Sequence, residues 1–170
     1  MRIHGNTTGL KPAQTKALER LFKRRVPPAN VTTQQLNELL AATSFDTGRQ
    51  VGVLVNRKGH VEHVMVGDAH KLDLPDLGRH RAGEGRLRGV RLLHTHLLGE
   101  ELTRDDLTDL ALLRLDYVAA LEVTAEGRPG RWYSGWVSGD AEADVPWIVE
   151  KPTQAHEVVH FDFEGFLREL

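Results

Sequence analysis

Residues 49–67, "RQVGVLVNRKGHVEHVMVG", contain the pattern that decides the fold. The run from Val51 to Val55 is rich in β-branched residues, which is typical of a strand buried on both faces. The segment "NRKG" supplies a turn, and residues 61–66 return with partial alternation of apolar and polar residues. We therefore expect a β-hairpin here.

The sequence predicts helices and further strands around this hairpin. Leu18 and Leu21 share one face of an expected helix within residues 11–25, and Thr32 or Thr33 is the expected N-cap of a second helix. We also expect a short strand at 70–74, a strand at 90–96, a helix at 103–115, a second hairpin from 116–124 and 130–138, an irregular region at 139–157 and a helix from 162 onward. This order predicts an α+β fold in which helices pack on a mixed β-sheet.

The length of 170 residues fits one domain with a substantial core. We expect an N-terminal helical segment at 1–32, a core domain at 33–138, and an irregular C-terminal segment with the start of a linker helix at 139–170. Because that last helix has no closing cap, the natural protein is expected to continue beyond it.

The composition excludes several classes of site. The chain has no cysteine, so disulfides, thiolate metal sites and a cysteine nucleophile are excluded. The net charge of -2 is too small to indicate a class of binding partner. The sequence contains no signal peptide and no apolar run long enough to span a membrane. We expect a cytoplasmic protein.

The segment "LLHTHLLGEELTRDDL", residues 92–107, carries the chemistry. In a strand His94 and His96 point to one side and Thr95 to the other, so two imidazoles can chelate one divalent ion. Asp106 follows in the first turn of the expected helix and can complete a facial set of ligands for zinc, with Thr103 beside the fourth position. The alternative is structural, because Thr103 and Asp106 also match a helix capping box.

These residues resemble the motif of the JAMM/MPN metalloproteases and their RadC relatives. That motif is H-x-H, a spacer of about seven residues, and S-x-x-D. Here the spacer is one residue shorter and Thr103 replaces the serine. The resemblance covers residues 33–137 and implies a cytidine-deaminase-like core, zinc on His94, His96 and Asp106, and an oxyanion role for Thr103.

One departure from this family concerns its general base. In active members a glutamate on an earlier strand takes the proton of the water on the metal. That position falls on Gln50, or on Arg49 if the register slips by one, and an amide cannot accept the proton. Glu100 and Glu101 are the carboxylates that can conceivably substitute. The resemblance therefore implies a catalytically defective domain, with an active (iso)peptidase or amidohydrolase as the alternative.

A second resemblance spans nearly the whole chain. Residues 5–28, 48–97 and 102–123 are similar to the N-terminal extension found in a subset of HflX GTPases. This implies an accessory or regulatory module next to a downstream GTPase domain, with the ribosome and its RNA as possible partners. The chain has no phosphate-binding G-x-x-x-x-G-K-[ST] motif, so we expect no nucleotide in it.

An arginine-rich loop suggests an alternative function, which is RNA binding. Arg79, Arg81, Arg86 and Arg88, with Arg91 just beyond, can contact RNA phosphates, or the loop can be an ordinary solvated one. The run "KRR" at residues 23–25 suits the C-terminal end of a helix better than a nucleic-acid patch.

Overall fold

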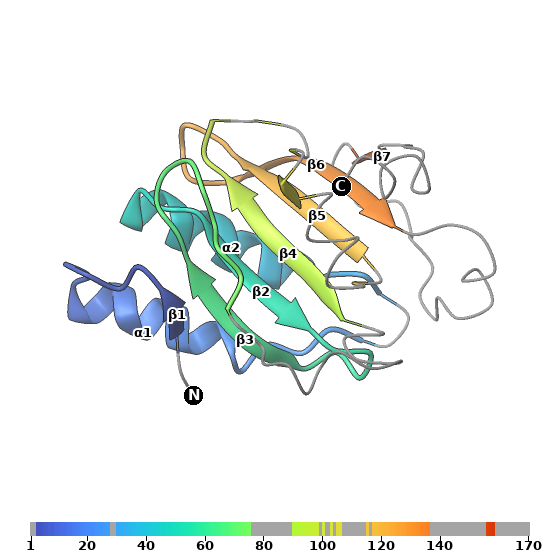
Figure 1. Ribbon diagram of the computed structural model, residues 1–170, viewed down its shortest axis with the longest axis horizontal. Helices are drawn as coiled ribbons and strands as arrows, with labels where there is room; N and C mark the ends of the chain where they lie inside the picture. Colours follow the sequence, from blue (N-terminus) through green and yellow to red (C-terminus); the bar gives the residue numbers. More distant parts are fainter. Residues whose placement is uncertain are drawn as a thin grey trace.

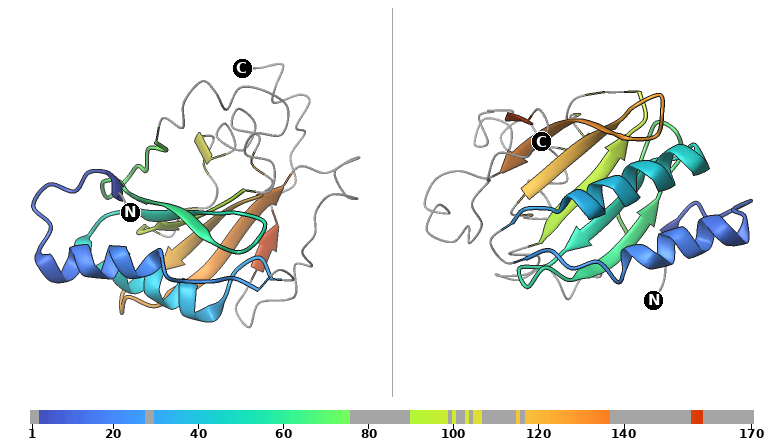
Figure 2. Two further views of the ribbon diagram at one scale, coloured as in Figure 1. Left: turned by 90° about the horizontal axis from the view of Figure 1, so that it is seen from below. Right: turned by 180° about the vertical axis from the view of Figure 1, so that it is seen from behind.

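The protein folds into one mixed β-sheet with two helices on one face (Figures 1 and 2). The computed structural model describes residues 3–27, 30–75, 90–98, 100, 103, 105–106, 115, 117–136 and 156–158. Its elements are β1 (Ile3–Gly5), α1 (Pro12–Leu21), α2 (Gln34–Thr47), β2 (Val51–Val55), β3 (Val61–Val66), β4 (Arg91–His96), β5 (Tyr117–Val123), β6 (Pro129–Trp136) and β7 (His156–Val158). The predicted α+β class with a mixed sheet and packed helices is confirmed.

The seven strands lie in the order β1-β3-β2-β4-β5-β6-β7. The two predicted hairpins, β2–β3 and β5–β6, are antiparallel. β4 lies between them, antiparallel to β2 and parallel to β5. β4 is therefore central, and all six of its residues are buried.

The ends of α2 follow the chemistry of its sequence. Thr33 is the N-cap, and its hydroxyl accepts a hydrogen bond from the Leu36 amide at 3.1 Å. Gly48 ends the helix with a φ of 66°, a left-handed conformation that glycine adopts without strain. Beyond this cap, the chain enters β2.

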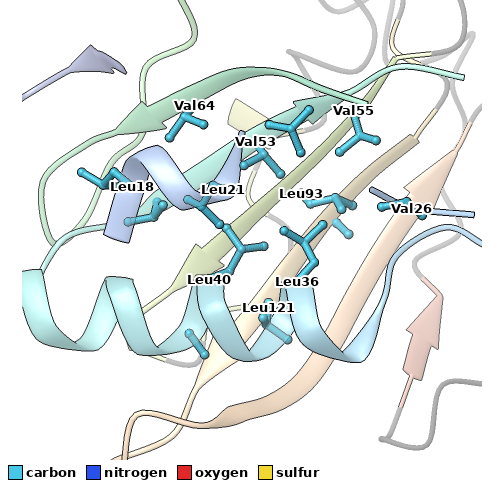
Figure 3. Close-up of a cluster of buried hydrophobic side chains, with 14 of the residues drawn as sticks. Leu18, Leu21, Val26, Leu36, Leu40, Val53, Val55, Val64, Leu93 and Leu121 are labelled. Atoms are coloured by element: carbon cyan, nitrogen blue, oxygen red, sulfur yellow. The ribbon is translucent and has the colours of Figure 1, made fainter. Parts of the chain in front are cut away.

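The main core lies between the helices and one face of the sheet (Figure 3). Leu18 and Leu21 from α1 and Leu36 and Leu40 from α2 pack against alternate strand residues such as Val53. A smaller apolar cluster lies on the opposite face, around Leu54, Met65, Leu92 and Val118. Both faces of β2 and β4 are therefore covered, which explains the continuous apolar run of β2.

The expected strand at 70–74 is wrong. The Asp68 carboxylate accepts hydrogen bonds from the amides of His70 and Lys71, both at 2.7 Å, so these amides are not available to a neighbouring strand. The segment is a loop over the face of the sheet opposite the helices, where Leu72 and Leu74 pack on the smaller cluster.

Most of the expected helices at 103–115 and from 162 onward lies outside the described residues. A short strand, β7, overlaps the end of the region predicted to be irregular and pairs in parallel with β6. Within the part of the chain that the structure describes, no helix is long and apolar enough to cross a membrane.

Candidate metal centre

β4 presents two imidazoles on the face of the sheet away from the helices. The Nε2 atoms of His94 and His96 lie 3.0 Å apart, and both side chains are almost fully buried. Thr95 points to the helix side, where its hydroxyl donates to Ser44 Oγ of α2 at 2.7 Å and accepts from the Val51 amide. This anchored threonine fixes which face of β4 carries the histidines.

Asp106 brings a carboxylate to the same point. Its Oδ1 lies 2.9 Å from His94 Nε2, and its Oδ2 lies 3.4 Å from His96 Nε2. One donor atom from each of the three residues lies within 4.8 Å of the others, and all three residues are buried. This group can hold a metal ion.

Thr103 and Asp106 also form the predicted capping box. The Thr103 amide donates to Asp106 Oδ2 at 2.8 Å, and the Asp106 amide donates to Thr103 Oγ1 at 3.2 Å. Asp106 can cap the helix and bind a metal at the same time, because the cap orients its carboxylate and leaves Oδ1 facing His94. The Thr103 hydroxyl proton is not used by the capping box.

A second contact orients His96. Its Nδ1 lies 2.8 Å from the carbonyl oxygen of Glu100, so Nδ1 carries the proton and Nε2 faces Asp106. Glu100 contributes this carbonyl while its side chain is exposed, and Glu101 lies outside the described residues. His94 Nδ1 is buried and has no hydrogen-bond partner among the described residues.

The electrostatics of the three groups are coupled. Burial alone would raise the pKa of Asp106, but the neighbouring His94 and His96 and the Thr103 amide outweigh it and hold that pKa well below its usual value. Burial likewise opposes the charged form of His96, but Asp106 and the Glu100 carbonyl raise its pKa. Without a metal, the ionised Asp106 therefore favours a proton on His96.

The distances fit a small divalent ion. Nitrogen ligands of a tetrahedral zinc ion, each about 2.05 Å from the metal, lie about 3.3 Å apart. The 3.0 Å between the two Nε2 atoms is close to that separation. A small movement of each side chain would place the three donors around one ion.

A pocket with a volume of about 280 Å³ opens beside two of the three candidate ligands, His96 and Asp106. The residues that line it are Gln50, His70, Lys71, Leu72, Asp73, Leu74, His96, Thr103, Asp105 and Asp106. Gln50 thus shares a pocket with two of the ligands. Arg49 points elsewhere, because its guanidinium donates to the carbonyl oxygens of Asn6 and Thr8.

Gly52 is a site residue that the sequence reading missed. It is the ladder partner of His94, and a Cβ atom there would lie 2.6 Å from Leu72 Cδ2 and 3.1 Å from His94 Cβ. An alanine methyl at residue 52 would therefore crowd both Leu72 and His94. A lone glycine inside a β-branched strand was the available signal.

The residues predicted to contact RNA lie outside the described residues: Arg79, Arg81, Arg86 and Arg88. Arg91 does not belong with an exposed RNA-binding loop, because it is fully buried on the helix side of β4. Its guanidinium donates to backbone carbonyls of Asn30, Val31 and Asn56 at 2.6 to 3.0 Å.

Comparisons with known proteins identify no relatives. No protein-family model matches the chain, and no curated protein or solved structure is significantly similar to it.

Proposed function

We propose that this chain is a zinc-binding domain with a JAMM-like ligand set that lacks the general base of the active enzymes. The observation that carries the proposal is the buried group of His94, His96 and Asp106, whose donor atoms already face one another. A buried carboxylate and two imidazoles so close together are costly unless a proton or a metal lies between them.

The choice of zinc follows from the donor types. Two imidazole nitrogens and one carboxylate oxygen suit zinc and leave a fourth position open. That position would face the pocket, since His96 and Asp106 both line it. A zinc ion bound there would supply Lewis acidity to whatever occupies the pocket.

Gln50 supports the catalytically defective form of this proposal. Gln50 lines the same pocket as His96 and Asp106, at the position where the resemblance expects a glutamate. An amide holds a ligand by hydrogen bonds but cannot accept a proton near neutral pH. Of the two other candidate bases, Glu100 is exposed and is not among the residues that line the pocket, and Glu101 lies outside the described residues.

Cobalt(II) substitution tests the proposal. The protein loaded with cobalt should show the intense visible absorption of a four-coordinate ion, and Asp106→Asn should change that spectrum. In peptide and isopeptide assays the zinc-loaded protein should be inactive, and Gln50→Glu should gain activity if only the base is missing. Octahedral cobalt absorption that Asp106→Asn leaves unchanged would contradict the metal site. Activity in the unmodified protein would favour the active hydrolase.

We further propose, from the resemblance to HflX extensions, that the domain acts as an accessory module of such a GTPase. The chain should form a complex with the GTPase part of an HflX protein, seen by size-exclusion chromatography, or change its rate of GTP hydrolysis. Neither effect at micromolar concentrations would contradict this role while leaving the zinc proposal intact.

A further inference from the structure

Two basic segments meet at one end of the sheet. The backbone of Arg25, just after α1, pairs with His60 in the turn between β2 and β3. The Val26 amide donates to the Gly59 carbonyl at 2.9 Å. Gly59 has a φ of 82° and packs directly on the Val26 backbone, so the turn and the end of α1 form one continuous surface.

This surface concentrates positive charge. We call it the basic end and define it by Lys23, Arg24, Arg25, Arg57 and Lys58. All five are exposed except Arg24, which is half-buried. The nearest carboxylates in sequence are Glu19, about one turn before Lys23, and Glu62, which accepts a hydrogen bond from Asn56. Because the whole chain carries a net charge of -2, the rest of it is correspondingly acidic.

Backbone hydrogen bonds hold together the two segments that carry these cations. The guanidinium of Arg25 donates to the carbonyls of Phe22 and Arg24, so it closes the C-terminal end of α1. Lys23 and Lys58 form no salt bridge with any carboxylate among the described residues. Both ammonium groups are therefore available to a ligand, one from each segment.

The chemistry of this surface is charge without apolar contact. The large hydrophobic side chains that the structure shows exposed are Phe45 and Leu98. Leu98 follows β4, and Phe45 packs on Gly127 in the β5–β6 turn. Both lie at the opposite end of the sheet, because Val55, just before the basic turn, pairs with Arg91 at the start of β4. Membrane binding and single-strand binding draw on apolar anchors or stacking rings beside the cations, whereas the phosphates of a duplex can be bound by cations alone.

We propose that the basic end binds the phosphate backbone of double-stranded nucleic acid. It lies at the end of the sheet away from His96 and Gln50, so this binding needs no metal. The proposal rests on the arrangement of the described cations and not on the zinc proposal. It would give an HflX-type accessory module a surface for structured RNA.

Fluorescence anisotropy with labelled 20-base-pair duplexes of RNA and of DNA, at about 50 mM salt and above, tests the proposal. The wild-type protein should bind at least one duplex, with an affinity that falls steeply with salt. Lys23→Glu/Lys58→Glu should weaken binding about tenfold or more and lower the salt slope by about two. Binding of both duplexes would mean that charge alone is read, and a preference for RNA would mean that A-form geometry contributes.

The matched control is Arg128→Glu/Arg131→Glu, which changes the net charge equally on exposed residues of the β5–β6 hairpin. It should leave the affinity within about twofold of wild type. Lys23→Gln/Lys58→Gln serves as the second variant, and the thermal unfolding of each protein is measured in parallel. The proposal would be overturned if the wild-type protein bound no duplex at low salt, or if the control variant lost as much affinity as the lysine variants. It would also be overturned if the lysine variants bound as tightly as wild type, or if poly-glutamate competed for the protein as well as the duplex does. We expect the same zinc content in wild type and in every variant.

Discussion

Gly52 lies directly opposite His94 in the ladder between β2 and β4, and a Cβ atom at residue 52 would lie 2.6 Å from the end of the Leu72 side chain. The missing side chain at residue 52 thus lets Leu72 pack on β2 beside a candidate ligand. A small residue in the strand is part of the site although it carries no chemistry of its own.

Replacing Gly52 with alanine should therefore displace the loop or crowd His94. The added methyl would overpack a buried space, which costs about 1 to 3 kcal/mol of unfolding free energy. Urea unfolding measures this cost, and zinc affinity should fall at the same time. Gly130→Ala is the control, since the atoms nearest to its Cβ belong to the half-buried Glu122 side chain, which has room to move toward solvent. Equal stability of the two variants would show that the contact of Gly52 with Leu72 is unimportant.

Arg91 should be required for folding and not for binding. Arg91→Met would leave the carbonyls of Asn30, Val31 and Asn56 without their donor and should cost about 3 kcal/mol or more. Arg91→Lys should recover only part of this loss, because one ammonium cannot replace a planar fork of donors. Urea midpoints measure both effects. A variant with wild-type stability would contradict the structural role.

Tyr117 should make the protein sensitive to high pH. Burial raises the pKa of its phenol to about 12, although hydrogen bonds from Ser134 and Trp132 partly oppose the shift. In the unfolded chain this phenol has a pKa of about 10. The contribution of the buried, neutral phenol to the free energy of unfolding is therefore complete below that pH and is lost as pH rises toward 12. The loss amounts to about 2 to 3 kcal/mol.

The measurement is urea unfolding between pH 8 and about 12, with absorbance at about 295 nm to follow phenolate. Tyr133→Phe removes the second of the two tyrosines and isolates Tyr117. Tyr117→Phe should flatten the pH profile and, by leaving the Trp132 indole N–H unpaired, cost about 1 to 3 kcal/mol at neutral pH. Titration of Tyr117 near its ordinary value would contradict its burial.

Local patterns in the sequence predicted much of the fold. The strand β2 is a continuous apolar run and β5 nearly so, and Thr33 is one of the two N-caps expected for α2. The placement of His94 and His96 on one face needs only the two-residue period of a strand. These features depend on neighbours in the chain, which a single sequence displays.

The remaining features depend on distant partners. Arg91 belongs by sequence to a basic loop, and only the carbonyls near residues 30 and 56 reveal it as a buried anchor. The 70–74 segment has the apolar alternation of a strand, but Asp68 takes its amides into a turn. The basic end joins residues about 30 positions apart in the chain. The run at 23–25 therefore could not by itself predict that a second basic segment lies beside it.

The zinc content of purified, tag-free protein, measured by elemental mass spectrometry after zinc is supplied and the excess removed, tests the central claim most directly. We expect about one zinc ion per chain, and a loss of nearly all of it in His94→Ala/His96→Ala. The control is His4→Ala/His63→Ala, because these two rings also meet, with nitrogens 3.4 Å apart, and should keep the zinc. Wild-type protein without zinc, or zinc that survives the loss of His94 and His96, would contradict the account.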